Sequence, residues 1–241
     1  MTPRWPGAVR PLLVAFTVLA VVHLGALLAG ASLVDHLTKP ALMPVLAVYV
    51  LARGGPVLLA GALLFGCGGD TFLQLGGHGG GVVFLVGMGS FAAGHVCYLL
   101  LCGRHGSPPG GRARTGAFAG GYALALIATV ALLWSDLPAD LRIPVAGYSL
   151  LLTAMAFGAV RAGLWAAAGG LLFLLSDTLI ASGIAHWPQL PAPQFWIMLT
   201  YTVAQFALAE GVLRAAAERQ GAGRRSTRPP QTVTAEAASR P

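Results

Sequence analysis

The chain has 241 residues, of which 56% are hydrophobic and only 10% are charged, and its mean hydropathy is +0.74. This composition excludes a soluble globular domain, because eight acidic residues and a single lysine cannot cover a solvated surface. The net charge of +7 is spread among loops and not clustered on one face, so no nucleic acid partner is expected. The sequence is typical of an integral membrane protein.

Apolar runs long enough to cross a bilayer recur along most of the chain. A hydrocarbon core about 30 Å thick takes about 20 helical residues. We therefore predict an all-α, polytopic membrane bundle with about eight transmembrane helices, at 11–30, 40–52, 56–75, 82–102, 116–134, 143–160, 163–184 and 195–217. The second run is short and contains two prolines, so a re-entrant or interfacial segment is the alternative there. The transmembrane domain is expected to cover 1–219, and the polar segment 220–241 is expected to be a disordered cytoplasmic tail.

The distribution of basic residues predicts the orientation. With the N-terminus inside, 13 of the 15 Lys and Arg residues fall on inner segments, and only Lys39 and Arg142 fall outside. The positive-inside rule then predicts a multi-pass protein of the cell membrane with both termini in the cytoplasm. The first run follows Arg4 and Arg10 and ends in small residues, as a secretory signal peptide also does, but it is long enough to be a retained helix.

Two aspartates interrupt otherwise apolar runs. A charge at the centre of a bilayer costs roughly 2.5 to 3.5 kcal/mol, so Asp70 and Asp177 are candidate functional residues. Each lies about four residues, or roughly 6 Å, past the middle of its predicted helix, which places both at one depth. Two carboxyls that share a cavity repel each other, which favours the protonated form of one. The alternative is that each only forms structural hydrogen bonds between helices. The flanks "GALLFGCGGDTFL" and "GGLLFLLSDTLI" are similar enough to hint at a parallel repeat.

Other polar residues inside the predicted spans suggest binding or positioning groups. His95 is an acid, a base, a metal ligand or a partner of a neighbouring side chain, and Tyr98 follows it on the same helix face. It is expected to lie deeper than the aspartates. Tyr201 and Gln205 form a second polar face at a spacing of four. Lys39 either snorkels to the interface or binds a lipid phosphate at the outer mouth of the cavity.

Near the predicted inner interface, Glu210 is followed four residues later by Arg214. This spacing predicts a local ion pair on one helix.

Several motifs together resemble one family. They are "KPALMP" from Lys39, "GALLFGCGGDTFL" around Asp70, "FLVGMGSFAAGHVCY" around His95, "GGLLFLLSDTLIA" around Asp177 and "YTVAQ" from Tyr201. In order and spacing they resemble the YhhN family of lysoplasmalogenase-like membrane proteins. The resemblance implies an eight-helix bundle that hydrolyses the vinyl ether bond of lysoplasmalogens to a fatty aldehyde and a glycerophospho-base. A departure is the glycine-rich approach "GCGG" before the first aspartate, which would loosen that helix or let a substrate chain approach closely.

The resemblance also implies roles for these residues. Asp70, Asp177 and His95 would be catalytic, Lys39, Tyr98, Tyr201 and Gln205 would bind a lysophospholipid, and neither a metal nor a cofactor is expected. Vinyl ether hydrolysis needs a protonated acid and a carboxylate beside a water, which a pair of aspartates provides.

Two other functions fit the same residues. A lipid or small-solute transporter would use the aspartates as proton carriers, although the internal repeat is poor. A metal-dependent lipid hydrolase would use His95 and the aspartates as ligands, but only His23 and His95 are available inside spans. Membrane lipids are the expected surroundings, and the sequence carries no signal of the oligomeric state.

Overall fold

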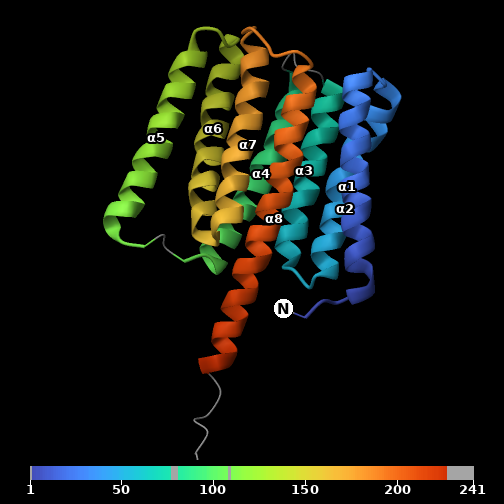
Figure 1. Ribbon diagram of the computed structural model, residues 1–241. Helices are drawn as coiled ribbons and strands as arrows, with labels where there is room; N and C mark the ends of the chain where they lie inside the picture. The colour runs from blue at the N-terminus through green and yellow to red at the C-terminus, as the bar shows by residue number, and fades with distance from the viewer. Residues whose placement is uncertain (1, 77–80, 108–109, 227–241) are drawn as a thin grey trace, which may run out of the picture.

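The computed structural model describes residues 2–76, 81–107 and 110–226. These residues form eight α-helices and one 3-10 turn, with no strand among them, so the all-α prediction is confirmed (Figure 1). The helices are α1 Pro6–Ala29, α2 Ser32–Ala52, α3 Val57–Gly76, α4 Val82–His105, α5 Arg112–Trp134, α6 Ala139–Ala159, α7 Leu164–Ile184 and α8 Pro193–Ser226.

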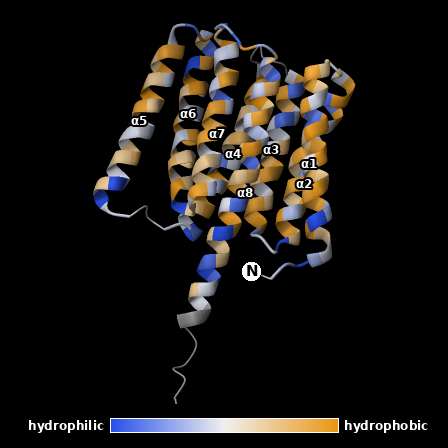
Figure 2. Ribbon diagram, in the orientation of Figure 1, coloured by the Kyte–Doolittle hydropathy of each residue, from blue (hydrophilic) through white to orange (hydrophobic). Residues whose placement is uncertain are grey.

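The outer surface of the bundle is apolar. All eight helices of the described chain are long and hydrophobic enough to cross a membrane, and orange, hydrophobic positions dominate the helices in Figure 2. Large side chains point outward without protein cover, among them Val21 at 65%, Leu124 at 69% and Leu164 at 85% exposed. Water would not tolerate so continuous an apolar surface, whereas lipid does. The chain is a multi-pass membrane protein.

Small residues bring α7 and α8 into close contact. A Cβ added at Gly169 would lie 2.7 Å from the backbone nitrogen of Leu208, and one added at Gly211 would overlap Ala166. Such glycines let helix backbones approach closely in membranes, where no hydrophobic effect drives the helices together. α1 is part of the same bundle, since Phe16 and His23 are buried against its neighbours. By contrast, Leu133 is the one buried residue that α5 contributes, so α5 lies at the edge of the bundle.

Helix α2 is longer than predicted. The sequence indicated a start at Pro40 and left a re-entrant segment open, but the helix begins at Ser32 and is one of the spanning helices. Pro44 has no backbone N–H, so the carbonyl of Pro40 loses its partner within the helix. The Cys67 thiol of α3 donates to that carbonyl, with sulfur and oxygen 3.2 Å apart. The neighbouring helix therefore satisfies the freed group and the helix continues.

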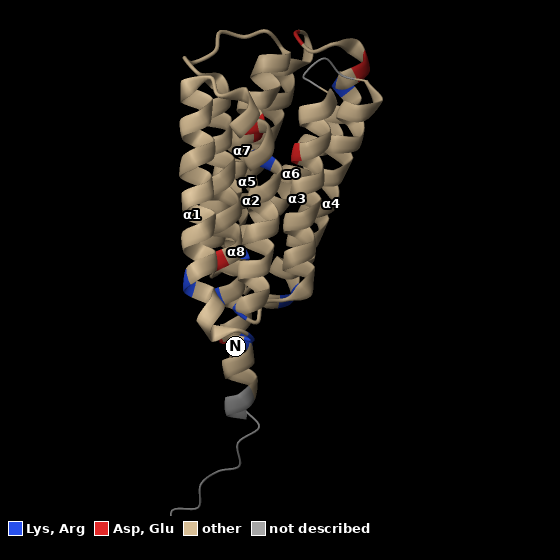
Figure 3. Ribbon diagram, turned by 90° about the vertical axis from the view of Figure 1, so that its right-hand side faces the viewer, with Lys and Arg blue, Asp and Glu red and all other residues tan. Residues whose placement is uncertain are grey.

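The N-terminus and the end of α8 lie at one end of the bundle, where the basic residues also gather (Figure 3). We call it the basic end; it carries, among others, Arg4, Arg53, Arg104 and Arg161. Helices α1, α3, α5 and α7 end at the opposite end of the bundle (Figure 1). Helix α8 continues to Ser226, past the predicted boundary at 219, because alanine, arginine and glutamine favour helix there. Residues 227–241 of the predicted tail lie outside the described residues.

A partly buried ion pair connects the end of α2 with α8 near the basic end. Glu210 accepts hydrogen bonds from Arg53 at 2.8 Å and from the Tyr49 hydroxyl at 2.6 Å. The predicted pair with Arg214 is present but longer, at 3.7 Å. The nearer cation therefore comes from another helix, because α2 brings Arg53 beside Glu210.

Candidate active site

A polar cavity of about 320 Å³ opens among α2, α3, α7 and α8, nearer the opposite end than the basic end. Asp70, Asp177 and Lys39 all line it, together with Gln74 and Tyr201. The structure thus brings together the two aspartates and the lysine that the sequence singled out. Because α3 and α7 both run from the basic end to the opposite end, equal positions along them lie at equal depth.

Asp70 ends a chain of hydrogen bonds. The Tyr201 hydroxyl donates to Asp70 Oδ2 at 2.8 Å, Gln205 Nε2 donates to the Tyr201 hydroxyl at 3.3 Å, and the Tyr98 hydroxyl donates to Gln205 Oε1 at 2.7 Å. Of these three predicted binding residues, Tyr201 lines the cavity. Tyr98 and Gln205 are buried behind it, at 1% exposed each, and hold Tyr201 in place.

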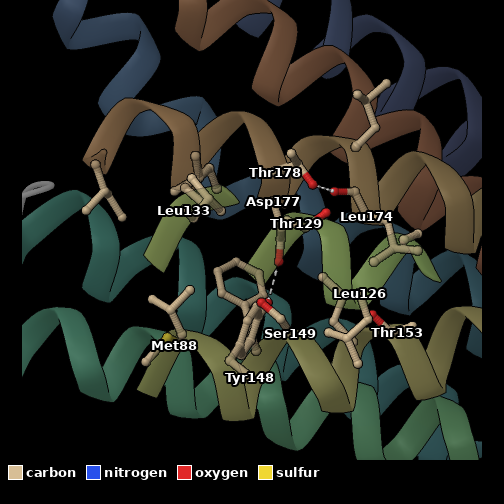
Figure 4. Close-up of a pocket in the computed structure, with 18 of the residues that line it drawn as sticks. Met88, Leu126, Thr129, Leu133, Tyr148, Ser149, Thr153, Leu174, Asp177 and Thr178 are labelled. Carbon is tan, nitrogen blue, oxygen red and sulfur yellow. Dashed lines mark hydrogen bonds between the residues drawn. The ribbon is translucent and has the colours of Figure 1, made fainter. Parts of the chain in front are cut away.

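Asp177 has a different partner, which the sequence did not predict. The Tyr148 hydroxyl of α6 donates to Asp177 Oδ2 at 2.5 Å (Figure 4). His95 Nε2 lies 3.0 Å from the same hydroxyl. Since the tyrosine gives its single proton to the carboxyl, its oxygen accepts from His95 Nε2–H. This fixes the histidine tautomer and leaves its Nδ1 as an acceptor. The sequence gives one sign of Tyr148, a phenol within an otherwise apolar helix. A buried phenol needs a hydrogen-bond partner, but the sequence does not say which residue provides it.

His95 reaches the site only through Tyr148. It is 1% exposed, packs edge-on against Phe173 with ring centroids 4.8 Å apart, and does not line the polar cavity. His95 lies nearer the basic end of the bundle than the two aspartates, as expected. His95 therefore contacts a residue of the site without lining either cavity.

The glycine-rich approach to Asp70 makes room for protein side chains. A Cβ at Gly66 would lie 2.9 Å from Gln205 Nε2 and 3.0 Å from the Tyr201 hydroxyl, and one at Gly69 would overlap the Phe91 ring. The suggestion that these glycines admit a substrate chain is therefore wrong. Gly66 lets the polar side chains of α8 reach Asp70, and Gly69 lets Phe91 of α4 pack closely on α3.

The two aspartates also differ in burial. The glycine-rich flank of Asp70 and the bulkier flank of Asp177 predict that Asp177 is the drier carboxyl, but the structure shows the opposite. Asp70 is 4% exposed, although glycines precede it, whereas Asp177 is partly exposed to the cavity space. Asp70 is thus the drier carboxyl, and Asp177 is the more accessible one.

Lys39 is held by the first turns of α2. His23 Nδ1 lies 2.8 Å from the Thr38 hydroxyl and 3.5 Å from Asp35 Oδ1, which ties these turns to α1. Lys39 is half-buried, and within the described residues it forms no ion pair with a carboxylate. Its ammonium is therefore available to an anion that enters the polar cavity.

Three aromatic rings lie on the side of the cavity toward the basic end. Phe91, Phe173 and Tyr201 pack edge to face, with centroids 5.5 to 6.4 Å apart. All three are buried. Within the described residues no three His, Cys, Asp or Glu side chains converge as metal ligands. The lining of the polar cavity thus offers the carboxyls of Asp35, Asp70 and Asp177, the His36 imidazole, the Lys39 ammonium and the Tyr201 phenol.

The fold and the site define a helical membrane protein with paired carboxyls in a cavity near one membrane surface. Over residues 34–212 the chain matches the model of the YhhN family, and it belongs to that family. It is 33% identical over 184 residues to the human lysoplasmalogenase TMEM86B, covering 76% of each chain. It is 30% identical over 199 residues to a lysoplasmalogenase of Mycobacterium bovis, covering 76% of this chain and 73% of the relative. No solved structure matches the chain significantly.

Proposed function

We propose that the protein hydrolyses the vinyl ether bond of lysoplasmalogen-type lysophospholipids, giving a fatty aldehyde and a glycerophospho-base. The observation that carries the proposal is that carboxyls from two helices, Asp70 and Asp177, line one cavity inside the membrane together with Lys39. The relatives named lysoplasmalogenase support the same activity. The lysine would bind the phosphate of the head group, and the cavity would place the ether bond between the carboxyls.

In the proposed reaction, Asp177 gives its proton to the alkene carbon of the vinyl ether. The Oδ1 atom is free to carry that proton, because Tyr148 donates to Oδ2. The oxocarbenium ion that results is stabilised by the carboxylate of Asp70, which also takes a proton from the water that adds to the cationic carbon. The hemiacetal then separates into aldehyde and alcohol, and the proton on Asp70 returns to Asp177 through the cavity that they share.

We assign the acid to Asp177 because its carboxyl is accessible from the cavity, and not because it is the more buried of the two. It is the more accessible carboxyl, so it can touch the substrate carbon. Asp70 lines the cavity with the only lysine of the chain, and a nearby cation favours a carboxylate. Tyr148 and His95 hold the acid in position.

The aromatic rings below the site favour a hydrolase over a transporter. A transporter needs a path that opens alternately to both sides, with a site between mobile halves. Phe91, Phe173 and Tyr201 pack against each other on the side toward the basic end. Such a floor suits a cavity that is entered and left from one side.

We further propose that the basic end faces the cytoplasm and that the protein lies in the cell membrane. In the topology predicted from the sequence, 13 of the 15 Lys and Arg residues fall on inner segments, as the positive-inside rule requires. Both termini would then be cytoplasmic, and the site would lie toward the outer leaflet.

The test is a set of asparagine variants. Asp70→Asn and Asp177→Asn should each abolish most release of aldehyde from a lysoplasmenyl phospholipid by the purified protein. The double variant should be little worse than either single one, because residues that act as one unit are not additive. Asp140→Asn, in the exposed first turn of α6, is the matched control and should keep full activity. Wild-type turnover should also be slower in heavy water, because a proton moves to carbon in the transition state.

Near wild-type hydrolysis by a folded variant of either intramembrane aspartate would refute the two-carboxyl mechanism. Release of aldehyde by neither the wild type nor the control would refute the proposed activity itself.

A further inference from the structure

A second, apolar cavity of about 260 Å³ lies beside the polar one, between α4, α5, α6 and α7 (Figure 4). Most of its lining is leucine and other apolar side chains, including Leu126, Leu152, Leu171, Leu174 and Leu175. The few hydroxyls in its wall include that of Thr178, which donates to a backbone carbonyl of its own helix at 2.7 Å. Such a wall suits a hydrocarbon and offers little to a polar ligand.

The two cavities meet at Asp177. Leu73, Phe91, Asp177 and Ile180 line both of them. A molecule with a charged head and an apolar chain can therefore place its head beside Lys39 and its chain among the leucines. The bond between head and chain would then pass the carboxyl of Asp177.

The opposite end of the bundle closes the apolar cavity toward water. A buried cluster there contains Phe84, Leu133, Leu137, Leu141, Val145 and Ile184, of which four also line the cavity. The Trp187 indole donates to Asp136 at 2.7 Å and ties the α7–α8 connection to the α5–α6 connection above this cluster. A chain cannot readily enter from that side.

The cavity opens sideways toward lipid instead. Leu171 and Leu175 line it and are nevertheless 55% and 48% exposed on the surface of α7. Ala125 of α5 lines it and is exposed as well. The mouth therefore lies between α5 and α7. Leu171 is seven residues into α7, or roughly 10 Å from its start at the basic end, about a third of the way along the helix.

We propose that this apolar cavity holds the alkenyl chain of the lysophospholipid, which enters sideways between α5 and α7, and that side chains of its wall such as Leu126 limit the chain accepted. The inference rests on the proposed hydrolase function. It fits a lipid of the leaflet nearer the site, whose head lies at the surface and whose chain ends at mid-membrane. The alkenyl chain moves from lipid and not from water, so its burial in the cavity gains little hydrophobic free energy. Selectivity for chain length must therefore come from the shape of the cavity.

The experiment compares two leucines of α5. Leu126 lines the cavity, whereas Leu124 is 69% exposed on the lipid side. Aldehyde release is measured for lysoplasmenyl ethanolamine phospholipids with a long and a short alkenyl chain. Leu126→Trp should lower kcat/KM for the long chain at least tenfold relative to the short chain, because an overfilled pocket rejects added methylenes. Leu124→Trp should leave that ratio unchanged.

A second variant keeps the inference testable if the Leu126→Trp protein does not fold. Leu126→Ala enlarges the cavity and should shift the ratio of the two kcat/KM values toward the long chain. If both folded Leu126 variants keep the wild-type ratio, the inference is overturned.

Labelling separates this inference from the proposed function. A lysophospholipid with a photoreactive diazirine at the end of its chain should label peptides of α5 and α7 around Leu126 and Leu171. Labelling of these peptides without any hydrolysis would support the chain-binding cavity and refute the proposed hydrolase function. Hydrolysis with labelling of other peptides would support the hydrolase function and refute the chain-binding cavity.

Discussion

Replacing Tyr148 by phenylalanine tests how Asp177 is positioned. The change removes one oxygen and keeps the ring, but that oxygen joins two partners, at 2.5 Å to Asp177 and 3.0 Å to His95. His95 is only 1% exposed, so its Nε2–H would be left buried without an acceptor. Such a loss costs about 1 to 3 kcal/mol. If that energy is lost from the positioning of the acid, kcat falls by roughly five- to 140-fold, since about 1.4 kcal/mol is a factor of ten.

The assay is steady-state release of aldehyde from a lysoplasmenyl phospholipid by protein in lipid nanodiscs. We expect Tyr148→Phe to lower kcat and to leave KM within about twofold, because the lost contact orients the acid without touching the head group. Tyr122→Phe is the matched control, since Tyr122 packs on Phe157 with ring centroids 6.0 Å apart and lines neither cavity. An unchanged kcat in folded Tyr148→Phe would refute the positioning role.

Three further predictions concern the rest of the chain. Lys39→Ala should mainly raise KM, by about ten- to a hundredfold for the roughly 1.5 to 3 kcal/mol of a charged hydrogen bond, and a loss of kcat alone would remove its role in binding phosphate. Gly66→Ala should lower both kcat and the thermal midpoint, because the new methyl meets polar side chains of α8 within 3.0 Å, whereas Gly61→Ala, with nothing within 4 Å, should do neither. A topology reporter fused after Arg104 should read as cytoplasmic and one near His186 as external; the reverse would overturn the proposed orientation.

The sequence was sufficient to predict the eight helices and to single out the two intramembrane aspartates as candidate site residues, for physical reasons. A run of about 20 apolar residues has few alternatives to a spanning helix, because every backbone group in lipid needs a partner. A carboxyl within such a run is costly, so Asp70 and Asp177 stand out from their apolar neighbours in the sequence itself. Equal depth on two helices of the same direction then made a shared cavity the natural prediction.

The partners of those aspartates could not be predicted in the same way. Tyr148 lies 53 residues from His95 and 29 from Asp177, and nothing local says that α6 stands between α4 and α7. The start of α2 was misplaced for a related reason. The carbonyl freed by Pro44 is satisfied by Cys67 from another helix, and local rules see only the proline.

The sideways mouth of the apolar cavity bears on how the purified protein is handled. Leu171 and Leu175 are exposed and lead inward, so whatever amphiphile surrounds the bundle has direct access to the space beside Asp177. A detergent with a straight alkyl tail would occupy that space at the millimolar concentrations used for solubilisation. Its tail would then compete with the lipid, and measured KM values would rise with detergent concentration. Bulky, rigid amphiphiles that do not fit between α5 and α7 would be the better medium for kinetic work.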